Sequence, residues 1–65
     1  MPQPLAKRLN ESAVTLVQEP GRDRQTVVGP LPPGVLLQER DVAFDEDSGD
    51  VAFWDRRFGA WLQAG

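Results

Sequence analysis

One tetrapeptide, Asp-Val-Ala-Phe, occurs twice, at residues 41–44 and 50–53, on either side of the acidic segment Glu46–Gly49. Both copies alternate in the way of a strand with one apolar face. Four-residue hairpin loops are commonly built around a type I turn, and the Ser-Gly pair that ends this segment suits the exit of such a turn. The repeat therefore predicts two antiparallel strands that fold back on each other, and it constrains the fold more than any other feature.

The loop also predicts the register of this hairpin. With Glu46–Gly49 as the loop, Asp45 faces Asp50, and the large apolar side chains of the two copies share one face. These side chains are Val42, Phe44, Val51 and Phe53, with Phe44 opposite Val51 and Val42 opposite Phe53, while Ala43 and Ala52 share the other face. A slip by one residue would split the large apolar set between the two faces. Burial therefore favours this register, and we expect the face of the large apolar residues to be covered.

The rest of the chain predicts further strands joined by turns. Apolar and β-branched residues at 12–18 and 24–29 predict two strands, and the Pro-Gly pair within 19–23 predicts the turn between them. The three prolines of segment 30–34 cannot donate ladder hydrogen bonds, so we expect a stiff connector there. Residues 35–38 follow as a short strand.

Residues 1–11 are predicted as a lead-in to the β domain. Pro2 and Pro4 disfavour a regular start, whereas Leu5 and Leu9 have the spacing of neighbours on a single helical turn that begins at Pro4. We expect this terminus to fray while both leucines dock on the core.

The tail, residues 54–65, fits two structures. Trp54, Phe58, Trp61 and Leu62 follow the spacing of an amphipathic helix, although Gly59 in its middle costs about 1 kcal/mol relative to alanine. A strand would instead place Phe58, Ala60 and Leu62 on one face. We expect the short helix, closing one mouth of a small barrel.

Together these elements predict a mainly β fold. The chain is expected to form a small antiparallel meander, or an SH3-like, partly open barrel of four to five strands, with a short C-terminal helix. Residues 12–65 make up a single small β domain after the lead-in at 1–11. A chain of 65 residues buries only roughly 60% of the surface that its unfolded form exposes. We therefore expect a homo-oligomer, or a chain that needs another protein as partner.

The chain has no cysteine and no histidine. Disulfides and thiolate metal sites are therefore excluded, and the commonest metal ligand and general base are missing. Its serines have no imidazole to activate them, and its glycines are isolated rather than grouped into a phosphate-binding loop. Neither a cysteine nor a long apolar run is present, which favours the cytoplasm over a membrane. These features predict a cytoplasmic protein that is not an enzyme and uses no cofactor.

The acidic segment of the repeat matches a calcium-binding loop only in part. Asp45 and Asp47 match the first and third positions of such a loop, but Gly49 and Asp50 stand at the fifth and sixth, and Arg56 stands where a bidentate glutamate is needed. We therefore predict a solvated hairpin tip. An irregular cation site at Asp45, Asp47 and Asp50 is the minor alternative.

Aromatic and basic residues are interleaved in the tail. They are Trp54, Arg56, Arg57, Phe58 and Trp61. Tryptophan and arginine are over-represented among the residues that dominate protein interfaces, and so small a domain has difficulty burying two tryptophans. We predict that these five residues form a protein contact surface. The same pattern can stack bases and contact phosphates, but the net charge of −3 argues against a nucleic-acid partner.

Residues 8–47 resemble a family of small uncharacterised bacterial β-rich domains. The matching pieces are Arg8, Glu11, Ala13–Val17, Val27–Val28, Leu31–Gly34 and Asp41–Val42. Arg40 stands where that family has glycine, and the second Asp-Val-Ala-Phe copy has no counterpart there. Because the family has no assigned activity, the resemblance implies only a β-rich fold.

These observations predict a non-catalytic protein-interaction or accessory module. Arginine supplies most of the basic residues, and alanine, glycine and proline are frequent, which suggests a small subunit of a bacterial or phage assembly. The alternative is a nucleic-acid-contacting small β-barrel that uses the same tail. An acidic inhibitor that imitates nucleic acid is a third class, for which the net charge of −3 is small.

Overall fold

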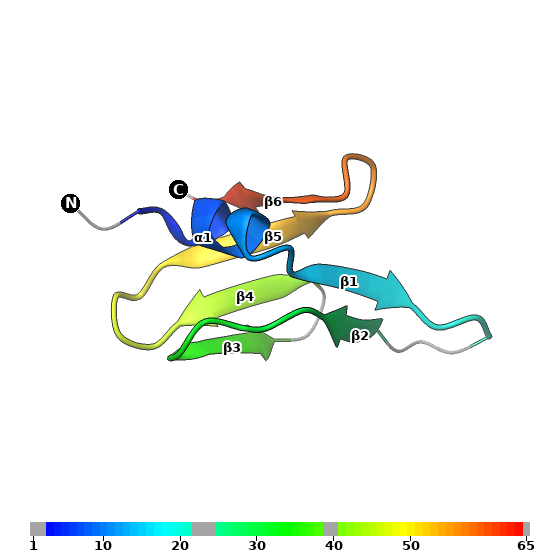
Figure 1. Cartoon of the computed structure of the whole chain (residues 1–65), viewed down its shortest axis with the longest axis horizontal. Coiled ribbons are helices and arrows are strands. Elements are labelled where there is room, and N and C mark those ends of the chain that lie inside the picture. Colours follow the sequence, from blue (N-terminus) through cyan, green and yellow to red (C-terminus); the bar gives the residue numbers. More distant parts are fainter. Residues whose placement is uncertain (1–2, 22–24, 39–40, 65) are drawn as a thin grey trace.

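The computed structural model describes residues 3–21, 25–38 and 41–64. These ranges contain one short helix and six strands, which are labelled in Figure 1. In chain order they are α1 (Leu5–Glu11), β1 (Thr15–Gln18), β2 (Gln25–Val28), β3 (Val35–Gln38), β4 (Val42–Asp45), β5 (Val51–Asp55) and β6 (Ala60–Gln63). Residues 22–24, which end the predicted first turn and begin the second strand, and residues 39–40 lie outside the described ranges. No helix in the described part is long and apolar enough to cross a bilayer.

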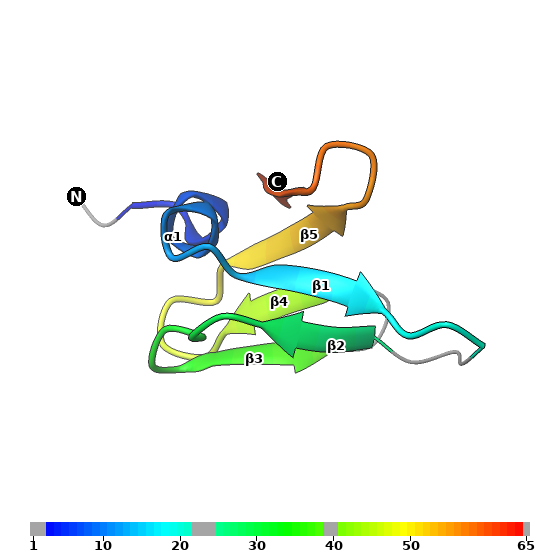
Figure 2. The same ribbon diagram turned by 45° about the vertical axis from the view of Figure 1, so that its right-hand side comes forward.

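The strands form two antiparallel sheets. β1 pairs with β2, while β3, β4, β5 and β6 pair in chain order as a meander. The mainly β prediction is therefore confirmed, with six strands where four to five were expected. The described strands do not join into one closed barrel, because no strand of the hairpin pairs with the meander. α1 and the β1–β2 hairpin instead lie as a layer against the meander (Figure 2).

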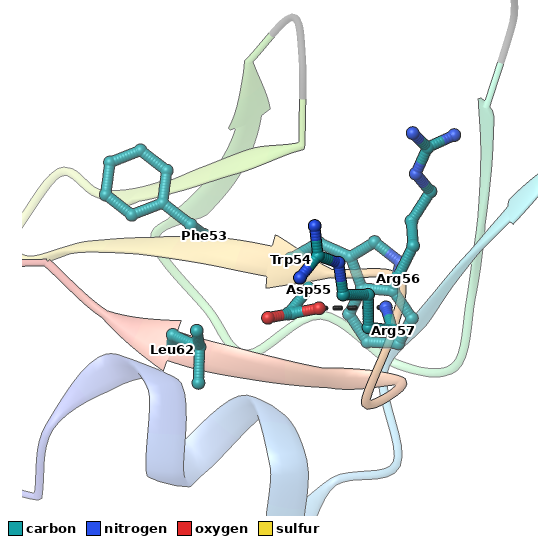
Figure 3. Close-up of a pocket in the computed structure, with 6 residues that line it drawn as sticks. All are labelled: Phe53, Trp54, Asp55, Arg56, Arg57 and Leu62. Atoms are coloured by element: carbon teal, nitrogen blue, oxygen red, sulfur yellow. Dashed lines mark hydrogen bonds between the residues drawn. The ribbon is translucent and has the colours of Figure 1, made fainter.

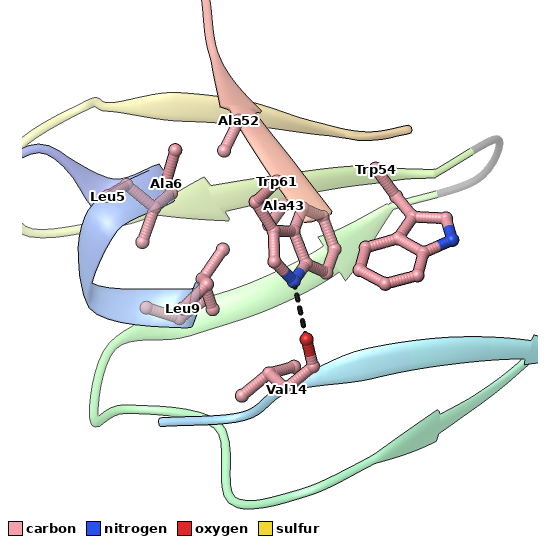
Figure 4. Close-up of a cluster of buried hydrophobic side chains, with 9 residues drawn as sticks. Leu5, Ala6, Leu9, Val14, Ala43, Ala52, Trp54 and Trp61 are labelled. Atoms are coloured by element: carbon pink, nitrogen blue, oxygen red, sulfur yellow. Dashed lines mark hydrogen bonds between the residues drawn. The ribbon is translucent and has the colours of Figure 1, made fainter. Parts of the chain in front are cut away.

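The core lies between these two layers. Leu5 and Leu9 of α1 are fully buried, which confirms that both leucines dock, and the seven-residue helix is longer than the single turn expected. The buried apolar side chains come from α1, its exit and four strands of the meander (Figure 4). They are Leu5, Ala6, Leu9, Val14, Val35, Ala43, Ala52, Trp54 and Trp61.

The chain leaves α1 through a left-handed residue. Ala13 has φ +57°, and the following Val14 amide donates to the carbonyl of Leu9 at 3.1 Å, which satisfies one of the free carbonyls at the helix end. Gly29, just after β2, lies against this exit. A Cβ added to Gly29 would stand 2.7 Å from the carbonyl oxygen of Ala13. This close backbone approach positions the β1–β2 hairpin against the helix.

The register predicted from the tetrapeptide repeat is confirmed. Phe44 pairs with Val51 and Val42 pairs with Phe53 across β4 and β5. The prediction of the covered face, however, is wrong: Ala43 and Ala52 are fully buried, whereas Phe53 is 47% exposed. The physical reason is that the residues covering the alanine face are mostly distant from it in the sequence. The alanine face lies under α1 and the two tryptophan rings, which supply the bulk of the core, so small residues are needed there.

The predicted C-terminal helix is wrong, and the strand alternative is the observed one. The tail continues β5 through a turn into β6, with Trp54 opposite Trp61 and Asp55 opposite Ala60. The turn is closed by the amide of Gly59, which donates to the carbonyl of Asp55 at 2.8 Å, and Gly59 has φ +61°. Glycine in mid-helix is unfavourable, but it adopts this left-handed turn position without strain.

The proline-rich connector at 30–34 contains no strand, as expected, and it ends in a tight turn before β3. The amide of Val35 donates to the carbonyl of Pro32 at 3.2 Å, and Gly34 has φ +82°. The carbonyl of Gly34 also accepts a hydrogen bond from Glu46 at 2.9 Å. The connector therefore fixes the turn between β4 and β5 as well as the start of β3.

Candidate functional site

The two tryptophans of the predicted contact surface belong to the core. Trp61 is 2% exposed and Trp54 is 9% exposed, and their rings meet edge to face with centroids 5.3 Å apart. The indole N–H of Trp61 donates to the carbonyl of Val14 at 2.8 Å, which satisfies its polar atom inside the core (Figure 4). Both rings therefore pack mainly in the core, and Trp54 reaches the surface only at its margin.

α1 also closes the free edge of the meander at β6. The Asn10 side chain accepts a hydrogen bond from the amide of Trp61 at 2.8 Å and donates to its carbonyl at 3.1 Å, as a neighbouring strand would. The Gln63 side-chain oxygen accepts from the amide of Ala6 at 3.0 Å. Because the backbone of Trp61 is already paired, this position of the edge is not free to add another strand.

The other three predicted contact residues are exposed together in the turn between β5 and β6. Arg56, Arg57 and Phe58 all face solvent, and Phe58 is 77% exposed. We call residues 56–59 the arginine turn. A carboxylate oxygen of Asp55 accepts hydrogen bonds from the amides of Arg57 at 2.8 Å and Phe58 at 3.4 Å, so this turn has a fixed shape.

A larger apolar surface, absent from the predicted site, lies on the side of the meander that faces away from α1. Strand alternation places six apolar residues there, and we call this set the outer face. It consists of Leu36, Val42, Phe44, Val51, Phe53 and Leu62. Leu36, Phe53 and Leu62 are each about half exposed, at 51%, 47% and 49%. No described element covers this face.

At one end of the outer face lies an acidic turn, residues 46–49. It follows Asp45, which is 3% exposed and forms an ion pair with Arg8 of α1. The Arg8 guanidinium, helped by the amide of Asp47, lowers the pKa of the Asp45 carboxyl below its ordinary value of 3.8. Asp45 is therefore a structural anion that ties α1 to this turn.

The three cation-site candidates are not gathered into a metal site. The carboxylate of Asp45 is occupied by Arg8 and by the amide of Asp47 at 2.9 Å, while the side chains of Asp47 and Asp50 belong to the rim of the turn. Among the described residues, no three acidic side chains come together in a way that could hold a metal ion. The acidic turn is instead a cluster of surface charge.

The acidic turn and the arginine turn lie at opposite ends of β5, because the acidic turn precedes this strand and the arginine turn follows it (Figure 1). The outer face is therefore an apolar strip between a negative end and a positive end. At the positive end is a depression of about 390 Å³ (Figure 3). It is lined by Phe53, Trp54, Asp55, Arg56, Arg57 and Leu62.

Phe53 and Leu62 are thus the main contact candidates that sequence reasoning missed. The signal for them was present in the strand alternative for the tail. If Trp54 and Trp61 face the core, their neighbours Phe53 and Leu62 must face the opposite side of the sheet.

No family model matches this chain, and neither the curated proteins nor the solved structures include a match to it.

Proposed function

We propose that this chain is a non-catalytic protein-interaction or accessory module whose contact surface is the outer face with the adjoining arginine turn. The observation that carries the proposal is the half-exposed trio Leu36, Phe53 and Leu62 on one open sheet. Contiguous exposed apolar patches are typical of protein contact sites, and their burial is favourable by about 25 cal/mol per Å² of apolar surface.

The arginine turn adds specificity to this surface. Arg56 and Arg57 border the apolar strip, and both line the depression that contains Phe53. An apolar centre with a charged rim is the usual composition of a protein interface, and arginine and aromatic residues tend to dominate its energy. The proposal replaces Trp54 and Trp61 by Phe53 and Leu62 and keeps Arg56, Arg57 and Phe58.

We propose no catalytic role, because the chain lacks a suitable general acid or base and an activated nucleophile. The buried carboxyl with a perturbed pKa, Asp45, is shifted downwards and held by Arg8. Such a group stays ionised at neutral pH and is a poor proton donor or acceptor there. With no histidine or cysteine in the chain, a nucleophile would have no imidazole to activate it.

We also propose an assembly and a cellular compartment for the module. The composition favours a small subunit of a bacterial or phage assembly, and the lack of cysteine favours the cytoplasm. The SH3-like fold and the resemblance to small bacterial β-rich domains stay predictions. The proposed contact surface does not depend on either of them.

Nucleic-acid contact stays the second candidate, but it has less support. Beside the arginines only the rings of Phe53 and Phe58 are exposed, because both tryptophans are buried, so two phenylalanine rings are available for base stacking. Phosphate contacts would weaken steeply with added salt, whereas an apolar protein contact would change little.

Site-specific photocrosslinking in an extract of the organism that encodes the chain tests the proposed function. Benzoylphenylalanine replaces Phe53 on the outer face and, as a control, Val17 on β1, which is 50% exposed. We expect one discrete protein product from position 53 and none from position 17. Unlabelled wild-type chain should compete for it, and Phe53→Ser/Leu62→Ser should not. Equal labelling from both positions, or none, would reject the outer face as the contact surface.

A further inference from the structure

We propose that the outer face binds the outer face of a second copy of this chain, with the strands of the two copies antiparallel. This inference rests on the proposed function and names the partner for the same surface. The two-fold axis lies in the plane between the sheets and crosses the strands, so that each copy presents the same residues to the other.

The shape and composition of the outer face suit packing against a second sheet. The outer face carries apolar side chains on all four strands of the meander, from Leu36 on β3 to Leu62 on β6. Two such sheets can pack face to face at about 10 Å, with their side chains interdigitated. In that arrangement the two meanders form the middle layers of the dimer, and α1 with the β1–β2 hairpin of each copy forms an outer layer. The outer faces of the two meanders then enclose a second core.

The two ends of the outer face carry opposite charges. Glu46 and Asp47 are exposed at the acidic turn, and Arg56 and Arg57 are exposed at the arginine turn. If the strands of two copies ran parallel, like charges would meet at both ends. In the antiparallel arrangement, the acidic turn of each copy lies over the arginine turn of the other, so the face is complementary to itself.

Two carboxylates near the arginine turn do not remove this complementarity. Asp55 is half-buried, and one of its oxygens is held by the amides of Arg57 and Phe58. Asp41 is also half-buried, and its carbonyl accepts a hydrogen bond from the amide of Trp54 at 2.8 Å. Both reduce the positive charge, but the charged side chains that extend into solvent from the turn itself are those of Arg56 and Arg57.

The area of the outer face limits the strength of the contact. Four strands of four to five residues cover about 300 Å² in plan, from strand spacing and rise per residue. Stable interfaces bury about 800 Å² per partner, so the sheet alone supports a weak dimer. Contact between the charged turns extends the interface at both ends. We expect a dimer that dissociates in the micromolar range or above.

Charge reversal at each end tests the antiparallel dimer. One variant carries Glu46→Lys and Asp47→Lys, and the other carries Arg56→Glu and Arg57→Glu. Each variant alone brings like charges together at both ends, and we expect its dissociation constant, measured by sedimentation equilibrium, to rise about tenfold. In an equimolar mixture every end meets an opposite charge, so association should return to at least the wild-type strength.

Two results would overturn the inference: a wild-type chain that stays monomeric at millimolar concentration, or a mixture that associates no better than its components. If a variant loses its fold, judged by circular dichroism, the salt dependence of the wild-type dimer decides. The antiparallel dimer must weaken with salt, and a dimer insensitive to salt rejects it. A monomer that still crosslinks from position 53 to a different protein would reject the dimer and retain the proposed function.

Discussion

Asp45 and Asp55 hold consecutive hairpin turns in the same way. One side-chain oxygen of Asp45 accepts hydrogen bonds from the amides two and three residues later, at 2.9 Å and 3.4 Å. The equivalent oxygen of Asp55 does so at 2.8 Å and 3.4 Å. In both turns a left-handed glycine, Gly49 or Gly59, donates its amide to the carbonyl of the aspartate at 2.8 Å. The turns at the two ends of the outer face therefore have the same backbone hydrogen bonds. They differ in the charges of their exposed side chains.

The first prediction concerns the hydrogen bonds that Asp55 accepts in its turn. Asp55→Ala removes the acceptor of two backbone amides, and we expect the free energy of unfolding to fall by about 1–2 kcal/mol, as for two ordinary hydrogen bonds. Asp55→Asn keeps an acceptor oxygen and should lose less. Urea titration followed by tryptophan fluorescence measures both variants. Equal losses for alanine and asparagine would show that these two hydrogen bonds do not stabilise the turn.

A second prediction uses the ion pair between Arg8 and Asp45. Because the folded-state pKa of Asp45 lies below 3.8, its contribution to stability is present above pH 3.8 and is lost as the pH falls through the folded value. Thermal unfolding from pH 6 to pH 2 should therefore show a larger fall in stability for the wild-type chain than for Asp45→Asn. Parallel curves would mean that ionisation of Asp45 does not stabilise the fold.

Glycine substitutions give the third prediction. Gly29→Ala places a methyl group 2.7 Å from the Ala13 oxygen at φ +105°, and we expect a loss of about 2–4 kcal/mol from the clash and the left-handed backbone together. Gly21→Ala is the matched control, since Gly21 has φ +74° but no atom within 4 Å of the added Cβ. It should cost about 1–2 kcal/mol from the backbone alone. Thermal unfolding compares the two, and equal losses would contradict the close approach of β2 to the exit of α1.

The fourth prediction separates the two tryptophans. Trp61→Phe leaves the buried carbonyl of Val14 without its 2.8 Å donor and shrinks a ring that is 2% exposed, so we expect a loss of about 2–3 kcal/mol. Trp54→Phe, at the margin of the core with 9% exposure, should lose less. Urea unfolding followed by circular dichroism measures both. A larger loss for Trp54→Phe would contradict the central position of Trp61.

The register of β4 and β5 could be predicted from the sequence, and its covered face could not. A period of two determines which side chains share a face, so Phe44 opposite Val51 follows from the repeat and its loop. Which face is covered depends on residues distant in sequence. The bulk over Ala43 and Ala52 comes from α1 and from Trp61, and nothing within the repeat specifies these partners.

The same difficulty affected the candidate site. The arginines and Phe58 were predicted as contact residues, and the structure places them in an exposed turn. The tryptophans were assigned with them because helical spacing and strand alternation both fit the tail. The Asp-x-x-x-Gly pattern at 55–59 repeats that at 45–49, and this repeat is a sequence signal for a further hairpin, between β5 and β6. In a hairpin, Phe53 and Leu62 face away from the tryptophans.

The central claim is that the outer face, rather than another part of the surface, is where this chain binds protein. Amide chemical shifts of the wild-type chain, recorded by NMR over about a hundredfold range of concentration, test it most directly. We predict concentration-dependent shifts at Leu36, Phe53, Leu62 and the two charged turns, with Val17 and Thr26 on the β1–β2 hairpin unchanged. Shifts confined to that hairpin would contradict the claim and assign the contact surface to the opposite layer.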